Sequence, residues 1–151
     1  MSSIIFEAPF FCKIVGPPYS GKRKLVKNII ENHQKLIFPL VKRIIYCHIG
    51  PRPFFLENVE FFSGIPCLDL IRDSLIIFDD LEDFCISNLD VRTLFDSNPD
   101  SNSVIFLSNK YSYPGKFEKL INQKIDYFFQ IRDNFNHEQL SNFGYQFCFD
   151  S

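Results

Sequence analysis

Three short polar segments of this 151-residue chain have residue types and spacing suited to phosphate chemistry. In the first, an apolar run ends at Gly16, four residues follow, and a Gly21-Lys22 pair comes next. This spacing is typical of a loop that wraps backbone N–H groups around phosphates, with Lys22 bringing its charge to the β- and γ-phosphates. We predict that a nucleotide is bound here by Gly16, Ser20, Gly21, Lys22, Arg23 and Lys24. A surface turn rich in Pro and Gly is the alternative interpretation.

The second segment is a pair of acids, Asp79 and Asp80, which end the apolar run 74–78. Ligands of open parallel sheets bind where the strands end, so both carboxylates are candidate site residues. Asp79 is predicted to hold Mg²⁺ between the β- and γ-phosphates. Asp80 is predicted to orient or deprotonate the attacking water. Helix capping or solvation of a loop after the strand is the alternative for this pair.

The third segment is Ser108-Asn109, directly after the apolar run 103–107. In NTPases with an additional strand, a polar residue at the matching strand end contacts the γ-phosphate and the lytic water. The amide of Asn109 suits that role, so the predicted catalytic residues are Lys22, Asp80 and Asn109. Turn formation is the alternative, because Asn is common where strands end.

These segments must be positioned by strands and helices that alternate along the chain. Strands are predicted at about 11–15, 43–47, 59–62, 74–78, 103–107 and 125–131, and helices at about 21–33, 88–95, 116–122 and 136–143. The alternation predicts an α/β fold with a mostly parallel sheet, and continuous apolar strands predict that helices cover both faces. We expect one domain over residues 1–151, with a leader at 1–10 and the core at about 11–145. An edge strand is the alternative to a loose leader for residues 1–9.

Composition limits the partners that the chain can bind. The net charge of −2 creates no global basic field, so DNA contact would need a local patch or assembly into a ring. The five cysteines form no C-x-x-C pair, which favours a reducing compartment over a disulfide framework. Neither a signal peptide nor an apolar run of membrane-spanning length is seen, so we expect an intracellular soluble protein without a membrane partner.

Four stretches of sequence together resemble one protein family. In order they are KIVGPPYSGKRKLVKNIIENHQKLI, KRIIYCHIG, SLIIFDDLEDF and NSVIFLSNKYSYPGKFEKLINQKIDYFFQIRD. The chain resembles the viral genome-packaging ATPases of the FtsK–HerA superfamily, of the poxvirus and Maverick/Polinton-like type. By position, the residues that match the phosphate loop, the acidic strand end and the polar sensor are Gly16, Gly21, Lys22, Asp79, Asp80 and Asn109.

The resemblance implies a three-layer P-loop NTPase fold of the additional-strand class that uses ATP and Mg²⁺. It also implies a homo-oligomeric ring that moves double-stranded DNA into a capsid and contacts capsid proteins. Such a protein would act in the virion or in the host cytoplasm or nucleus. The function predicted from the resemblance is therefore an ATP-binding and ATP-hydrolysing motor subunit.

Three departures from the family pattern leave other functions open. Arg23 stands where the family has Ser or Thr, Pro17-Pro18 remove two N–H donors from the loop, and 100–102 lack the expected arginine. Arg23 could bind a phosphate, or it could exclude the metal. The main alternative is a catalytically impaired P-loop module that serves as an interaction or structural subunit. A small nucleotide kinase is a weaker alternative because no Arg-rich lid segment is evident.

Overall fold

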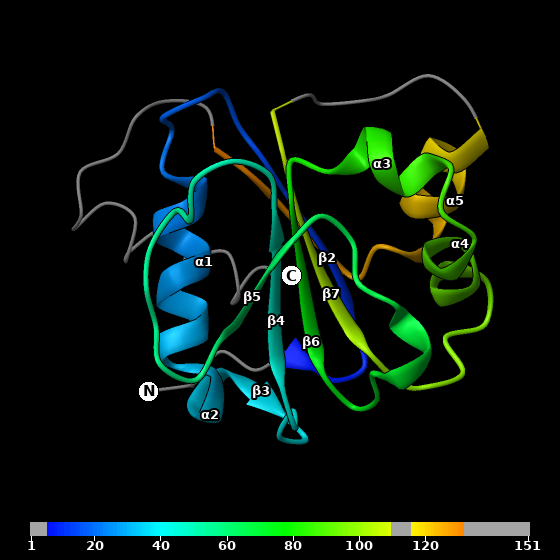
Figure 1. Ribbon diagram of the computed structural model, residues 1–151, viewed down its shortest axis with the longest axis horizontal. Coiled ribbons are helices and arrows are strands. Elements are labelled where there is room, and N and C mark those ends of the chain that lie inside the picture. The colour runs from blue at the N-terminus through cyan, green and yellow to red at the C-terminus, as the bar shows by residue number, and fades with distance from the viewer. Residues whose placement is uncertain (1–5, 110–115, 132–151) are drawn as a thin grey trace.

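The fold is built on a parallel six-stranded sheet with the strand order β5-β4-β6-β7-β2-β8 (Figure 1). A computed structural model describes residues 6–109 and 116–131 of the chain. Every neighbouring pair in this sheet is parallel, so the strands all end at the same edge. The strands are β2 (Phe11–Val15), β4 (Ile44–His48), β5 (Glu60–Ser63), β6 (Leu75–Asp79), β7 (Ser103–Ser108) and β8 (Tyr127–Gln130).

Helices cover both faces of this sheet and make three layers (Figure 1). On one side lies α1 (Lys22–Glu31), followed by the short helix α2 (His33–Leu36). On the other side lie α3 (Glu82–Ile86), α4 (Leu89–Asp96) and α5 (Lys116–Lys124), and a 3₁₀ turn, η1 (Leu68–Leu70), contacts α4. The predicted α/β class with a parallel sheet covered on both faces is therefore confirmed for the described residues.

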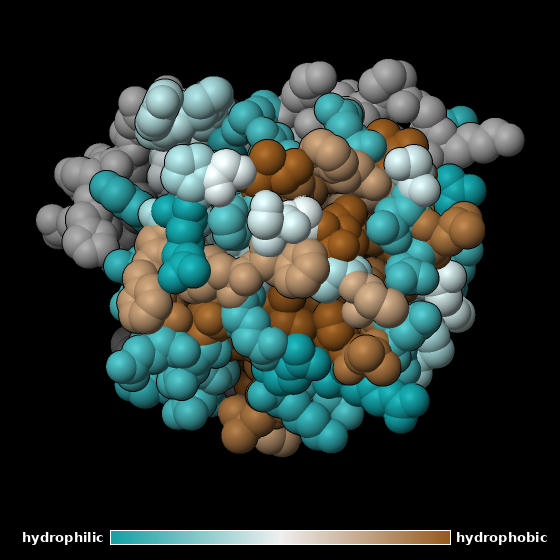
Figure 2. All heavy atoms as spheres, viewed as in Figure 1, coloured by the Kyte–Doolittle hydropathy of each residue, from teal (hydrophilic) through white to brown (hydrophobic). Residues whose placement is uncertain are grey.

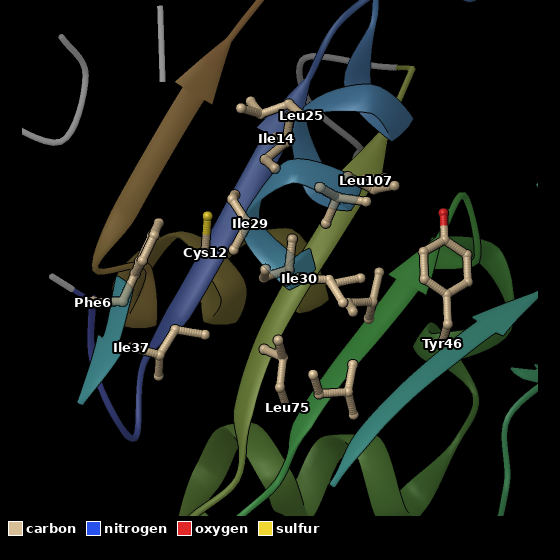
Figure 3. Packing of buried hydrophobic residues seen from close by; sticks show 14 of the residues in the cluster. Phe6, Cys12, Ile14, Leu25, Ile29, Ile30, Ile37, Tyr46, Leu75 and Leu107 are labelled. Carbon is tan, nitrogen blue, oxygen red and sulfur yellow. The ribbon is translucent and has the colours of Figure 1, made fainter. Parts of the chain in front are cut away.

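Two separate hydrophobic clusters show why the central strands are continuously apolar. Successive residues of a strand point to opposite faces, so a strand covered on both sides needs apolar residues at every position. Within β6, Leu75 and Ile77 pack in the cluster under α1, whereas Ile76 and Phe78 pack in the cluster under α4. Figure 3 shows the first cluster, in which side chains of α1 lie over β2 and β7.

The helix α1 forms because its apolar residues recur at helical spacing. Leu25, Val26, Ile29 and Ile30 are all buried against the sheet, as the spacing predicts. Its first turn contains no acid and carries Lys22, Arg23 and Lys24 instead. Positive charge at the positive end of a helix dipole is unfavourable, which indicates that these cations serve something other than helix stability.

Some short elements were not predicted from the sequence, and a strand within residues 1–9 was expected only as the alternative to a loose leader. The two-residue strands β1 (Phe6–Glu7) and β3 (Ile37–Phe38) pair in a second, small sheet, and α3 directly follows the acid pair. Phe6 and Phe10 are buried in the core, so the described part of the predicted leader packs against the main sheet. The helix predicted at 136–143 lies outside the described residues.

The surface seen in Figure 2 has apolar side chains across its middle, over the β5 edge of the sheet. Phe55 and Phe62 are exposed near this edge, and the Arg52 guanidinium lies over the rings of Phe55 and Phe61. Among the described residues, the helices are all too short or too polar to span a bilayer.

Candidate functional site

A cavity of about 480 Å³ opens at the edge of the sheet where β2, β6 and β7 end. It is lined by Pro18, Tyr19, Ser20, Gly21, Lys22, Arg23, Lys24, Asp79, Asp80 and Asn109. The strand order explains this convergence, because β7 lies between β2 and β6 and brings three loops to one place. The structure therefore brings together the residues predicted from all three segments, with Gly16 lying behind the loop.

Gly16 is needed because the chain packs tightly where β2 enters the loop. A Cβ atom at this position would lie 2.6 Å from Ser20 Oγ and 2.9 Å from the backbone oxygen of Ile131. Ser20 Oγ is buried and makes no hydrogen bond within the described part of the chain. At the other end of the loop, Gly21 has a φ of 106°, a left-handed conformation that favours glycine.

We expect Gly16→Ala to lower the free energy of unfolding by about 1–3 kcal/mol, the usual cost of overpacking a close-packed site. The new Cβ would press on Ser20 Oγ and on the Ile131 backbone. Urea denaturation followed by circular dichroism measures the effect. Adding Ser20→Ala should recover part of the loss, because it removes one of the two clashes, and a double variant no more stable than Gly16→Ala would contradict this packing.

Lys22 extends back under the loop and is largely buried. Its Nζ donates to the carbonyl oxygens of Gly16 at 2.5 Å and Pro17 at 3.0 Å, and to Asn109 Oδ1 at 2.5 Å. Burial lowers the pKa of Lys22, although the charges of Asp80 and Asp79 oppose this effect. The hydrogen bonds of Lys22 thus connect the loop to the residue that follows β7.

Asp79 is held by two donors from different elements. Its Oδ2 accepts a hydrogen bond from Arg23 Nε at 2.8 Å and another from the Tyr46 hydroxyl at 2.7 Å. The Asp79 side chain is 3% exposed, whereas that of Arg23 is 59% exposed. Burial raises the pKa of Tyr46, and the negative charge of Asp79 raises it further, so this hydroxyl remains a donor. The predicted metal ligand is therefore engaged by a guanidinium and a phenol.

Asp80 lines the cavity with an exposed side chain. Its backbone has a φ of 57°, and its N–H donates to the Leu107 oxygen of β7 at 2.9 Å. Burial and the neighbouring charge of Asp79 raise the pKa of this carboxyl, against attraction from Lys22 and Arg23. A carboxylate whose charge is disfavoured in a cavity is a candidate proton acceptor, so the role predicted for Asp80 from the sequence stays a prediction.

We expect Asp80→Asn to stabilise the protein at pH 7 by less than about 1 kcal/mol, since the side chain is solvent-screened. Asn also tolerates the left-handed backbone at this position. Because the carboxyl pKa is raised on folding, the folded state binds more protons just above the ordinary pKa, and stability falls as pH rises through that window. This fall should be absent in Asp80→Asn, measured by thermal unfolding between pH 3.5 and 7.

The same charge removal at Asp83→Asn is the matched control. Asp83 lies in the first turn of α3, outside the residues that line the cavity, where a carboxylate is favoured by the helix dipole. Because the charge of Asp83 also raises the pKa of Asp80, but less than burial and Asp79 do, we expect a smaller gain in stability from this variant than from Asp80→Asn. An equal gain in both variants would show that net charge, and not the environment of Asp80, is responsible.

Residues 100–102, where the family that the chain resembles often has a basic pair, lie at the opposite edge of the sheet because they precede β7. Asn102 is buried and joins two segments, accepting from the Ser74 N–H at 3.1 Å and donating to the Ile71 oxygen at 2.9 Å. Asp100 forms an ion pair with Arg72. This segment therefore has a structural role in the described part of the chain.

Two residues of the site were missed in the sequence. Tyr46 belongs to β4, and its hydroxyl reaches Asp79 from the neighbouring strand. Glu82 is buried at the start of α3, and its charge raises the pKa of Lys22. A polar atom inside an apolar strand is the signal for Tyr46, and the acid two residues after Asp80 is the signal for Glu82. Neither signal shows which residue the side chain of Tyr46 or Glu82 acts on.

No protein-family model matches the chain, and the search of curated proteins finds no significant match. The candidate site is therefore identified from its residues and their geometry.

Proposed function

We propose that this chain binds ATP in the cavity, with the β- and γ-phosphates against the loop of residues 16–22. The observation that carries the proposal is the position of Lys22 Nζ, between the loop carbonyls and Asn109, at the start of a helix whose first turn holds three cations. Helix N-termini and concave loops of N–H groups both favour phosphate. A phosphate would replace the carbonyl contacts of Lys22.

The arrangement of strands supports assignment to the additional-strand class of P-loop NTPases. In the described sheet, β7 separates the strand before the loop from the strand that ends in the acid pair. Asp80 and Asn109 line the same cavity as the loop. The proposal extends to hydrolysis, in which Asp80 orients or deprotonates water and the amide of Asn109 contacts the γ-phosphate.

Mg²⁺ fits the side chains of this site poorly. A divalent ion needs oxygen ligands, and Oδ2 of Asp79 already accepts two hydrogen bonds. Position 23, where the resembling family supplies a hydroxyl, brings a cation. We therefore derive no step of the proposed reaction through a metal.

A catalytically impaired nucleotide-binding module is the second candidate function, and the Arg23–Asp79 ion pair favours it. Such a module would bind ATP without turnover and act as an interaction or structural subunit. Ring assembly, double-stranded DNA and capsid proteins as partners rest on the resemblance, and these remain predictions.

The test is nucleotide-dependent thermal unfolding of the wild-type chain, combined with phosphate release. A ligand at about 100 times its Kd stabilises by about 2.7 kcal/mol, which gives a clear rise in Tm. We expect ATP and inorganic tripolyphosphate to raise Tm, and AMP, which lacks the β- and γ-phosphates, to have little effect. No rise with ATP or tripolyphosphate would overturn the proposal. A rise without phosphate release would favour the impaired module over the ATPase.

A further inference from the structure

Arg23 combines two properties at the mouth of the cavity. Its Nε–H is used by Asp79, while the side chain remains 59% exposed among the residues that line the cavity. A guanidinium carries four further N–H donors on its two terminal nitrogens, in a planar arrangement that matches phosphate oxygens. Arg23 can therefore keep its carboxylate partner and still offer donors to a ligand.

The contact with Asp79 fixes where this guanidinium lies. Asp79 is held from behind by Tyr46, a fully buried residue whose hydroxyl donates to the same oxygen. Figure 3 shows Tyr46 rising from β4 beside β6, which ends at Asp79. Burial lowers the pKa of Arg23, but the hydrogen bond and charge of Asp79 outweigh it and raise the pKa overall. The Arg23 guanidinium therefore stays charged, and its hydrogen bond to Asp79 holds it at the acidic end of β6.

The local charges favour an anion that brings no metal of its own. Three cations, Lys22, Arg23 and Lys24, line the cavity, against two carboxylates, Asp79 and Asp80. A divalent ion at Asp79 would have to displace Arg23 or lie beside it, and like charges at such distances repel strongly. A polyphosphate, in contrast, would meet the three cations already present, and the net charge of +1 on these five side chains attracts an anion.

We infer that this site binds the triphosphate as the metal-free anion, with the Arg23 guanidinium in the place that a divalent cation would take beside Asp79. The inference rests on the proposed function, because it concerns the form in which the nucleotide binds. It assigns part of the charge compensation of the terminal phosphates to a side chain of the protein. ATP affinity should consequently not require Mg²⁺.

The experiment is calorimetric titration of ATP at matched ionic strength, in EDTA and in excess Mg²⁺. For the wild type, we expect a Kd in EDTA at least as low as the Kd in Mg²⁺. Arg23→Thr restores a hydroxyl and removes the cation, so its affinity in EDTA should fall about tenfold, the value of a hydrogen bond to a charged group. This variant should in addition bind more tightly in Mg²⁺ than in EDTA.

Arg92→Thr is the matched control, because Arg92 is exposed on α4 and outside the cavity. It should bind as the wild type does in both buffers. Wild-type binding that is tighter in Mg²⁺ overturns the inference, even if Arg23→Thr fails to fold. An Arg23→Thr variant that equals the wild type in EDTA also overturns it. Absence of ATP and tripolyphosphate binding in both buffers would instead overturn the proposed function.

Discussion

Replacing Lys22 by methionine is expected to weaken ATP binding by roughly 10- to 100-fold, the value of losing a hydrogen bond to a charged group. Methionine keeps the unbranched apolar stem that is buried in the loop and removes only the ammonium group. Isothermal titration with ATP measures the loss. The Gly16 and Pro17 carbonyl oxygens and Asn109 Oδ1 lose this donor, so the free energy of unfolding without ligand should fall by about 1–3 kcal/mol, offset in part by removal of a charge that burial disfavours.

The control for this result is Lys27→Met on the same helix. Lys27 belongs to α1 but does not line the cavity, so the variant should bind ATP as the wild type does. The pH dependence gives a second check. The pKa of Lys22 is lowered, so wild-type affinity should fall with rising pH before the ordinary lysine pKa is reached, and Lys22→Met should lack this fall. Equal affinity of Lys22→Met and wild type would contradict a role for Lys22 in phosphate binding.

Phe106→Ala is expected to destabilise the fold by about 3–5 kcal/mol, the usual cost of a large cavity in a core. Phe106 is fully buried in β7 and stacks on Phe78 of β6 and Phe95 of α4, with ring centroids 5.2 and 5.4 Å apart respectively. It therefore joins the two strands that carry Asn109 and Asp79 to one of the helices covering them. Urea denaturation with a matched wild-type curve measures the loss.

Phe84→Ala provides the control with the same change of side chain. Phe84 is 54% exposed on α3, so its truncation should cost under about 1 kcal/mol. Similar losses in the two variants would mean that the Phe78–Phe106–Phe95 stack does not carry the packing between sheet and helix.

The main elements could be predicted because their signals are local. The strand 74–78 was recognised from the four consecutive apolar residues 75–78, and the helix after Gly21 from four apolar residues at helical spacing. The short strand β3 escaped prediction, and β1 was expected only as an alternative to a loose leader, because two residues carry no periodicity. Their pairing joins Phe6 to Ile37. The five-residue helix α3 is likewise too short for a pattern to distinguish it from a loop.

Most residues of the candidate site could be predicted from the sequence, but their contacts could not. Glycine spacing, an acid pair and an amide each follow a strand, and the carboxyl ends of parallel strands meet at one edge. Their convergence on one cavity followed from strand order, which pairs β2 with β7 and β7 with β6. Tyr46 was overlooked because only the neighbouring position of β4 and β6 gives its hydroxyl an acceptor.

The sequence by itself determined the α/β class, the position of the loop, and the set of residues that could bind phosphate. These properties depend on residues close together in the chain. It left two roles open for Arg23, contact with a phosphate or exclusion of a metal. Only the tertiary structure joined Arg23 to Asp79, 56 positions away, and backed Asp79 with Tyr46. Such a contact is decided by which strands pair and by burial, which removes water as an alternative partner for the carboxylate.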